Sequence, residues 1–302
     1  MTIEFSSECA AAARALTKMS LQEDLRDAGD LTSLSTITAD LHATVNIVSR
    51  QAGVLCGLTL LPIVFSELDA SMVVKYHRQD GDAVARQTLI ASISGPVRTL
   101  LTGERSVLNF MTLLSGIATR TAEFVAEVQH TKAVILDTRK TFPGYRLLQK
   151  YAVRCGGGTN HRMGLYDGIL IKDNHIAARG DSTCASAVAD ARSYAKAHHM
   201  NPEIEIEVDS LDQLRNALQE SPEIVLLDNM SPETMQQAVA IRNASNSQST
   251  LLEASGGVTL RTVRAIAESG VDRISIGSLT HSSPALDIGF DWPWQQCYRS
   301  NK

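Results

Sequence analysis

The stretch EIEIEVDSLDQLRNALQESPEIVLLD, residues 203–228, places two short apolar strands on either side of an amphipathic helix. Ser210 is a suitable N-terminal cap for that helix, in which Leu211, Leu214 and Leu218 recur on one face. A strand, a helix and a second strand form the repeating unit of parallel α/β folds. The stretch therefore predicts an α/β domain built on a parallel sheet.

The same unit recurs on both sides of this stretch. Six strands are expected in all: AVILD (133–137), GILIK (168–172), EIEIEV (203–208), EIVLLD (223–228), TLLEAS (250–255) and RISIG (273–277). Further helices are expected to begin at Ser231, which precedes Pro232 and Glu233, and at Thr259. Six strands do not complete an eight-stranded barrel, so the pattern leaves an incomplete barrel and a doubly wound sheet both open.

The N-terminal third of the chain has a different pattern. Residues 43–96 contain short apolar runs that are broken by turn sequences such as QDGD (79–82) and GP (95–96). This predicts a small β-containing domain, which a helix precedes. From residue 99 to about 129 the apolar residues recur at helical spacing, so we expect a helix that links the two domains.

Composition limits the classes of function that fit. The 302 residues are 44% apolar and 20% charged, a balance that builds a large aliphatic core. The net charge of −5 and the isoelectric point near 5.9 argue against nucleic acid or an anionic membrane as a partner. The first residues are acidic and no apolar run approaches the length of a membrane span, so we expect a cytoplasmic protein.

The cysteines support the same expectation. They are odd in number and widely scattered, with no CxxC pair and no zinc-like spacing: Cys9, Cys56, Cys155, Cys184 and Cys297. Such a pattern favours reduced, mostly buried thiols in a reducing cytosol.

The residues that end the predicted strands are unusually polar. Active sites of parallel α/β folds lie at the carboxyl ends of the strands, so these residues are the first candidates for a site. They are Asp137, Thr138, Arg139 and Lys140, then Lys172, Glu207 and Asp228, then Ser255, Gly256 and Gly257, and finally Gly277 and Ser278, with His281 shortly after.

A basic stretch runs from Thr138 to Lys172 and contains a single acidic residue, Asp167. Arg139, Lys140 and Lys172 stand at strand ends, where guanidinium and ammonium groups suit carboxylates and phosphates. By contrast, Arg146, Lys150 and Arg154 fall on the helix YRLLQKYAV and are expected to form its solvated face. The stretch therefore predicts a site for a small, strongly anionic substrate.

Glu207 and Asp228 end neighbouring strands beside those cations. Such a pair commonly holds Mg²⁺ on a polyphosphate or faces positive charge that develops on a substrate. An ion pair with Lys140 or Lys172 is the structural alternative. Gly256-Gly257 and Gly277-Ser278 are placed to offer backbone amides to a phosphate, and His281 is either a phosphate ligand or a local cap.

Several long blocks closely resemble the quinolinate phosphoribosyltransferase family, and together they span nearly the whole chain. They are DTRKTFPGYRLLQKYAVRCGGGTNHRMGLYDGILIKDNHI (137–176), LLDNMSPETM (226–235) and LEASGGVTLRTVRAIAESGVDRISIGSLTHSSPALDIGF (252–290), with the earlier blocks LQEDLRDAGDLTS (21–33), GVLCGL (53–58) and LLTGERSVLNFMTLLSGIATRT (100–121).

The resemblance implies a fold and a reaction. The fold is an N-terminal α/β sandwich domain, residues 1–102 with residues 279–302 packed on it, and an incomplete, seven-strand-type α/β barrel, residues 103–278. The reaction transfers phosphoribosyl from 5-phosphoribosyl 1-diphosphate to quinolinate with decarboxylation, giving nicotinate mononucleotide, CO2 and diphosphate, and it requires Mg²⁺. A homodimer with shared active sites is also implied, and a higher oligomer is possible.

The resemblance further assigns roles to residues. Arg139, His161, Arg162 and Lys172 would bind the quinolinate carboxylates, next to Thr138, and Arg105 would reach across from the second subunit. Lys140, Glu207 and Asp228 would be the catalytic residues, the two carboxylates also serving Mg²⁺. The 5-phosphate would be held largely by backbone amides, at positions Ser255, Gly256, Gly257, Ile276, Gly277, Ser278 and His281.

Three alternatives stay open. One is a paralogue from molybdenum transport operons, which shares the fold but prefers another substrate. Another is a Schiff-base aldolase that uses Lys140 or Lys172 as its amine. The last is a binder of phosphate ligands without catalysis. Phe142 and Tyr145 depart from residues frequent in the family and are expected to adjust the pocket without removing a charge.

Overall fold

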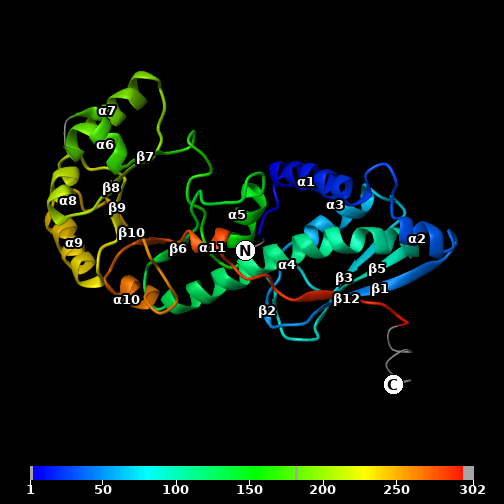
Figure 1. The fold of residues 1–302 in the computed structure, drawn as a ribbon. Helices are drawn as coiled ribbons and strands as arrows, with labels where there is room; N and C mark the ends of the chain where they lie inside the picture. The colour runs from blue at the N-terminus through cyan, green and yellow to red at the C-terminus, as the bar shows by residue number, and fades with distance from the viewer. Residues whose placement is uncertain (1–2, 181–182, 295–302) are drawn as a thin grey trace. The chain divides into compact units, whose positions relative to one another are not determined.

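The computed structural model describes residues 3–180 and 183–294, which fold as two compact units (Figure 1). Within the described chain, the first unit contains residues up to 122, then 141–157 and those from 279 onward, and the second contains 123–140 and 158–278. The division differs from a boundary after residue 102. Helix α4 (Val97–Val128) continues without a break past residue 102, so residues 103–122 stay in the first unit. Helix α5 (Arg146–Cys155) belongs to the same unit because it packs on α1 (Ser7–Leu25).

The first unit is an α/β sandwich around a four-stranded antiparallel sheet in the order β12-β1-β5-β3. Figure 1 draws α1, α3 and the first part of α4 on the same side of this sheet. The remaining elements of the unit are β1 (His42–Ser49), β2 (Gly53–Val54), β3 (Val73–Tyr76), β4 (Ala83–Val84), β5 (Leu89–Pro96), β12 (Ile288–Asp291), α2 (Leu31–Thr36), η1 (Leu58–Leu60), α3 (Leu61–Ser66) and most of α11 (Ser278–His281).

The C-terminal segment contributes an edge strand to this sheet. β12 pairs antiparallel with β1, and the side chains of Ile288 and Phe290 are buried. Residues 295–302, the last part of the segment expected to pack here, lie outside the described residues and include Cys297.

The second unit contains all six predicted strands, and every pair among them is parallel. The strands are β6 (Val134–Leu136), β7 (Ile169–Ile171), β8 (Ile204–Val208), β9 (Ile224–Asp228), β10 (Leu251–Ser255) and β11 (Arg273–Ser275). The helices are α6 (Asp173–Arg179), α7 (Cys184–Ala197), α8 (Leu211–Ala217), η2 (Leu218–Glu220), α9 (Pro232–Ala244) and α10 (Val263–Glu268). The prediction of a parallel α/β domain is confirmed.

The strand order decides between the two architectures that the pattern left open. The order is β6-β11-β10-β9-β8-β7, so the first strand of the unit pairs with the last. A doubly wound sheet would instead reverse its strand order at a switch point, and no such reversal is present in this sheet. The sheet is not closed, since β6 and β7 are its two unpaired edges, which is the strand order of an incomplete barrel. Thr159 forms an isolated parallel bridge with Leu136 at the free edge of β6, in the place of a seventh strand.

Capping explains two of the three predicted helix starts. The Ser210 hydroxyl accepts from the Gln213 N–H before α8, and the Ser231 hydroxyl accepts from the Thr234 N–H before α9. The prediction for Thr259 was wrong by four residues. Its carbonyl accepts from the N–H of Thr262, which closes a turn, and α10 begins at Val263.

The predicted solvated face of α5 was also wrong. Lys150 is 1% exposed, and Arg146 and Arg154 are half-buried. The Arg154 guanidinium donates to the Glu4 carbonyl and lies 5.6 Å from the centre of the Tyr151 ring. Because α5 packs on α1, and a Cβ at Gly156 would meet the Ala118 carbonyl of α4 at 2.3 Å, this helix has neighbours where solvent was expected.

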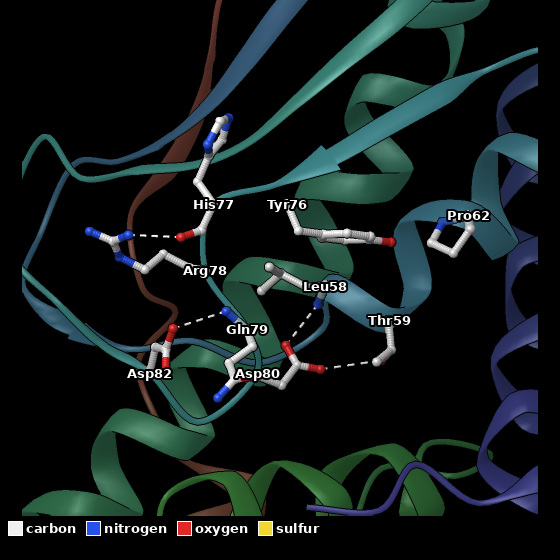
Figure 2. A pocket seen from close by; sticks show the side chains of 9 residues that line it. All are labelled: Leu58, Thr59, Pro62, Tyr76, His77, Arg78, Gln79, Asp80 and Asp82. Carbon is white, nitrogen blue, oxygen red and sulfur yellow. Dashed lines mark hydrogen bonds between the residues drawn. The ribbon is translucent and has the colours of Figure 1, made fainter. Parts of the chain in front are cut away.

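A hollow of about 640 Å³ lies in the first unit, and Figure 2 shows the residues that line it. Asp80 organises its floor. Its carboxylate points toward the start of η1 (Figure 2) and accepts from the Leu58 N–H, the Thr59 hydroxyl and the Tyr151 hydroxyl. Burial raises the pKa of Asp80 despite these three donors. All of its contacts are internal, which fits a structural role for this carboxylate.

The four cysteines within the described residues, Cys9, Cys56, Cys155 and Cys184, are buried and unpaired, as expected. No helix among the described residues is both long enough and apolar enough to span a membrane.

Candidate active site

The carboxyl ends of the six parallel strands share one edge of the sheet, and the predicted polar residues lie there. They are Thr138, Arg139 and Lys140 after β6, Lys172 after β7, Glu207 in β8, Asp228 at the end of β9, Ser255, Gly256 and Gly257 at the end of β10, and Gly277 and Ser278 after β11. Their backbone placement follows from the parallel topology alone. Their side-chain contacts divide them into groups.

Arg139 and Arg162 form a pair of like charges. The Nε atom of Arg139 is buried and has no hydrogen-bond partner. Burial and the charge of Arg139 both lower the pKa of Arg162, whose Nη1 donates to the Gly168 carbonyl at 2.9 Å. Two guanidinium groups held this way are destabilised by each other, so the pair is suited to an anion with more than one negative charge.

Lys172 and Glu207 form an ion pair, which was the alternative to a magnesium-binding or charge-stabilising role for the carboxylates. The Lys172 ammonium donates to Oε2 of Glu207, and the side chains are 44% and 13% exposed respectively. Because Lys172 stays partly open to solvent, its remaining donors can reach a ligand while Glu207 holds it in place.

Asp228 ends β9, and the bend at Asn229 follows it directly. It accepts from the Asn229 side-chain amide at 2.9 Å, and the Asn229 N–H donates to the Ser255 carbonyl at 2.9 Å. Asn229 adopts a left-handed conformation with φ +54°, and Gly256 has φ +98°. A Cβ on Gly256 would lie 2.1 Å from Oδ1 of Asn229, so glycine is required there. Gly257 also has a positive φ, of +59°, but a Cβ there would meet nothing within 4 Å.

Ile276 is placed differently from the expectation that its amide faces a phosphate. Its N–H donates to the Leu136 carbonyl at 2.9 Å, which extends the pairing of β11 with β6, and its side chain is 2% exposed. The Lys140 side chain is exposed, and its N–H donates to the Thr138 hydroxyl at 3.1 Å.

Two predicted residues belong to the first unit. Arg105 lies in α4 and is exposed, and His281 ends α11, where its Nδ1 lies 2.5 Å from the Ser282 hydroxyl. Phe142 and Tyr145 are in the same unit. Phe142 is 42% exposed, while the Tyr145 ring centre lies 6.1 Å from that of Phe110.

His161 lies in a buried network that sequence reasoning missed. Its Nε2 faces Oε2 of Glu205 at 3.1 Å and Oε1 of Glu253 at 3.3 Å, and Arg273 Nε donates to Oε2 of Glu253 at 2.8 Å. Its Nδ1 accepts from the Arg162 N–H at 2.7 Å. Glu205 and Glu253 are carboxylates in the middle of apolar strands, and that feature of EIEIEV and TLLEAS could have pointed to them.

The network lines a cavity of about 440 Å³. Its walls include residues that begin strands rather than end them, among them Val134, Ile169, Ile224 and Arg273. His161 and Arg162 line this cavity too, whereas Lys172 and Asp228 lie at strand ends.

Comparison with known proteins gives one consistent result. Residues 30–115 match the family model of the quinolinate phosphoribosyl transferase N-terminal domain, and residues 117–291 match that of the C-terminal domain. A probable nicotinate-nucleotide pyrophosphorylase (carboxylating) of Bacillus subtilis is 44% identical over 87% of this chain and 88% of its own. The nicotinate-nucleotide pyrophosphorylase (carboxylating) of Mycobacterium leprae is 43% identical over 93% and 97%. The solved structure of the Francisella tularensis nicotinate-nucleotide pyrophosphorylase superimposes with a TM-score of 0.85 at 38% identity, covering 94% of this chain and 96% of that one.

Proposed function

The chain belongs to the quinolinate phosphoribosyltransferase family, and we propose that Arg139, Arg162 and Lys172 bind the two carboxylates of its pyridine substrate. The enzyme transfers phosphoribosyl from 5-phosphoribosyl 1-diphosphate to quinolinate with loss of CO2, giving nicotinate mononucleotide and diphosphate in de novo NAD biosynthesis.

One observation carries the assignment of the carboxylate site. The buried Nε of Arg139 has no hydrogen-bond partner, and burial together with the charge of Arg139 lowers the pKa of Arg162. A dicarboxylate supplies the two negative charges and the acceptors that this pair lacks. Lys172, held by Glu207, adds a third cation.

Positioning and electrostatics are sufficient for the transfer step. The pyridine nitrogen of quinolinate is itself the nucleophile, so no activated serine or cysteine is required. Glu207 and Asp228, at the ends of the paired strands β8 and β9, face the positive charge that builds on the ribose as diphosphate leaves. Lys140 would bind near the diphosphate end of the second substrate.

Two carboxylates on adjacent strand ends also fit Mg²⁺, because this ion is commonly held by one or two carboxylates together with substrate phosphates. Glu207 and Asp228 are the residues that would hold it, and when bound it would neutralise charge on the diphosphate. Glu207 would then have to serve both the ion and Lys172.

The 5-phosphate site is proposed at the amides of Gly256, Gly257, Gly277 and Ser278, with Ser255 contributing its side chain. Ile276 is left out of the amide set, because its N–H is used in the sheet.

A matched pair of glycine variants tests this phosphate site. We expect Gly256→Ala to raise the KM for 5-phosphoribosyl 1-diphosphate by about tenfold or more, since it combines an unfavourable positive φ with a clash against Asn229. Gly257→Ala should have the smaller effect, because it carries the strain of a positive φ without the clash. Equal effects of the two variants, or a change in the KM for quinolinate alone, would contradict the placement.

The activity itself is tested by incubating the purified protein with quinolinate, 5-phosphoribosyl 1-diphosphate and Mg²⁺. We expect nicotinate mononucleotide, CO2 and diphosphate in equal amounts. Turnover of another acceptor but not of quinolinate would favour the molybdenum-operon paralogue. Borohydride trapping of a substrate on Lys140 or Lys172 would favour the Schiff-base reaction.

Two further properties are part of the proposal. The enzyme is a homodimer in which Arg105 completes the site of the partner subunit, which gives a function to an exposed arginine on α4. It resides in the cytoplasm, where the four described cysteines would stay reduced.

A further inference from the structure

A buried network surrounds His161, and its glutamates, Glu205 and Glu253, are not among the polar residues at the carboxyl ends of the strands. His161 is 9% exposed in its side chain, Glu205 4% and Glu253 0%. Oε1 of Glu205 is buried without a hydrogen-bond partner, and Oε1 of Glu253 is buried with the 3.3 Å contact to His161 Nε2 as its ion-pair contact. Buried carboxylates of this kind are costly, so a network that keeps two of them beside one histidine has a specific task.

Both ring nitrogens of His161 are engaged within the protein. Nδ1 accepts the Arg162 N–H at 2.7 Å, which requires this nitrogen to carry no proton. Nε2 faces the two carboxylates at 3.1 and 3.3 Å and therefore carries one. Burial lowers the pKa of His161, but the hydrogen bonds that its Nε2–H donates to Glu205 and Glu253 outweigh burial and raise the pKa to about 9. A second proton on Nδ1 would collide with the Arg162 N–H at 2.7 Å, so we assign the ring as neutral, with its single proton on Nε2.

The charges within the network favour a closed protein network over a metal site. The ligand atoms of His161, Glu205 and Glu253 lie within 4.8 Å of one another, a spacing that a cation could use. However, Arg273 already pairs with Glu253, and Arg162 lines the same cavity. These fixed cations supply the positive charge that a metal ion would otherwise bring.

Arg162 is the residue that this network controls. His161 holds its backbone N–H, and the Gly168 carbonyl holds its Nη1 at 2.9 Å, so the residue is fixed at both ends. The charge of Arg139 nevertheless acts on its guanidinium, which lowers the pKa of Arg162. Restraining Arg162 beside a like charge needs support that a solvent-exposed loop would not give.

We propose that His161, held by Glu205, Glu253 and Arg273, is a positioning residue that fixes Arg162 for the substrate carboxylate and does not itself contact the substrate. This inference rests on the proposed function, since it takes Arg162 to be a ligand of quinolinate. It replaces a direct role of His161 with an indirect one, because each of its nitrogens already has a partner.

Two substitutions of His161 separate the direct role from the indirect one. In His161→Asn the side-chain oxygen stands near the position of Nδ1 and can still accept the Arg162 amide. In His161→Gln the amide nitrogen stands near the position of Nε2 and can still donate to the carboxylates, while the acceptor for Arg162 is lost. The binding of quinolinate is measured by calorimetry, and kcat and both KM values are measured in parallel.

The positioning role predicts that His161→Gln weakens quinolinate binding about three- to tenfold, and that His161→Asn binds more tightly than His161→Gln. Neither should change the KM for 5-phosphoribosyl 1-diphosphate. The variant His161→Gln combined with Arg162→Ala should bind no more weakly than Arg162→Ala alone, because the histidine acts through this arginine. His130→Gln serves as the matched control, since His130 pairs with Glu268 on the surface of the same unit.

The opposite order of the two variants, or additive losses in the double variant, would show direct contact with the substrate and overturn the inference. A thermal unfolding midpoint for each variant identifies any general loss of folding, and the order of affinities is read at a temperature where all variants are folded. If the unchanged enzyme itself neither binds nor converts quinolinate, the proposed function fails instead, so the two failures are distinguishable.

Discussion

Arg139→Ala is expected to weaken quinolinate binding by about 2 to 4 kcal/mol, which corresponds to roughly 30- to 700-fold in affinity. The buried Nε of Arg139 has no partner in the protein, so a substrate carboxylate is its natural acceptor. Removing this arginine leaves one carboxylate of the bound substrate without its charge-assisted hydrogen bonds. Calorimetric titration of quinolinate into the purified enzyme measures the loss directly.

The same variant should behave in the opposite way when no ligand is present. Because the charge of Arg139 lowers the pKa of Arg162, the two guanidinium groups repel each other in the ligand-free protein. The thermal midpoint of ligand-free Arg139→Ala should therefore be unchanged or slightly higher than that of the unmodified protein.

Arg264→Ala, which removes an exposed arginine that pairs with Glu127 in the same unit, is the matched control and should leave binding unchanged. Unaltered quinolinate affinity in Arg139→Ala would remove this residue from the site. A large fall in thermal midpoint would mean that the arginine is structural.

Arg105→Ala should lower kcat/KM for quinolinate by at least about a hundredfold, because loss of a charged partner to a bound carboxylate costs several kcal/mol. Arg105 is exposed on α4 in the first unit, so its truncation should not disturb the core. Steady-state kinetics of the variant, with the thermal midpoint as a check on folding, measure the effect.

The origin of Arg105 in the partner subunit is tested by mixing variants. Neither Arg105→Ala nor Lys172→Ala should be active alone. After co-expression or subunit exchange, mixed dimers contain one site with both residues intact, so roughly a quarter of the full activity should return with random pairing. Recovery requires that the two residues come from different chains. No recovery, in a preparation where mixed dimers are demonstrated by mass, would contradict site sharing.

Much of the second unit could be predicted because its signals are local. The apolar runs that became β6 to β11 and the caps at Ser210 and Ser231 depend on neighbouring residues, and all were found at the expected places. The placement of Lys172, Glu207 and Asp228 on one edge followed from parallel topology. The start of α10 was misplaced because Thr259 closes a turn, for which a threonine is equally suitable.

What remained unpredictable depends on packing between distant segments. Lys150 looked solvated because the helix YRLLQKYAV alternates charged and apolar residues, yet α1 and α4 pack around it. Likewise, the N–H of Ile276 donates to the carbonyl of Leu136, which lies more than a hundred residues earlier in the chain.

The basic stretch from Thr138 to Lys172 shows which properties the sequence determines and which the tertiary structure determines. The sequence by itself determined that basic residues follow the strand ends, because hydrophobic periodicity and charge are properties of neighbouring residues in the chain. Only the tertiary structure decided which of them remain available. It paired Lys172 with Glu207, left Arg139 Nε without a partner and enclosed His161 between Glu205 and Glu253. These outcomes depend on strand order and register, which bring β8 and β10 to a loop that follows β6 in the chain.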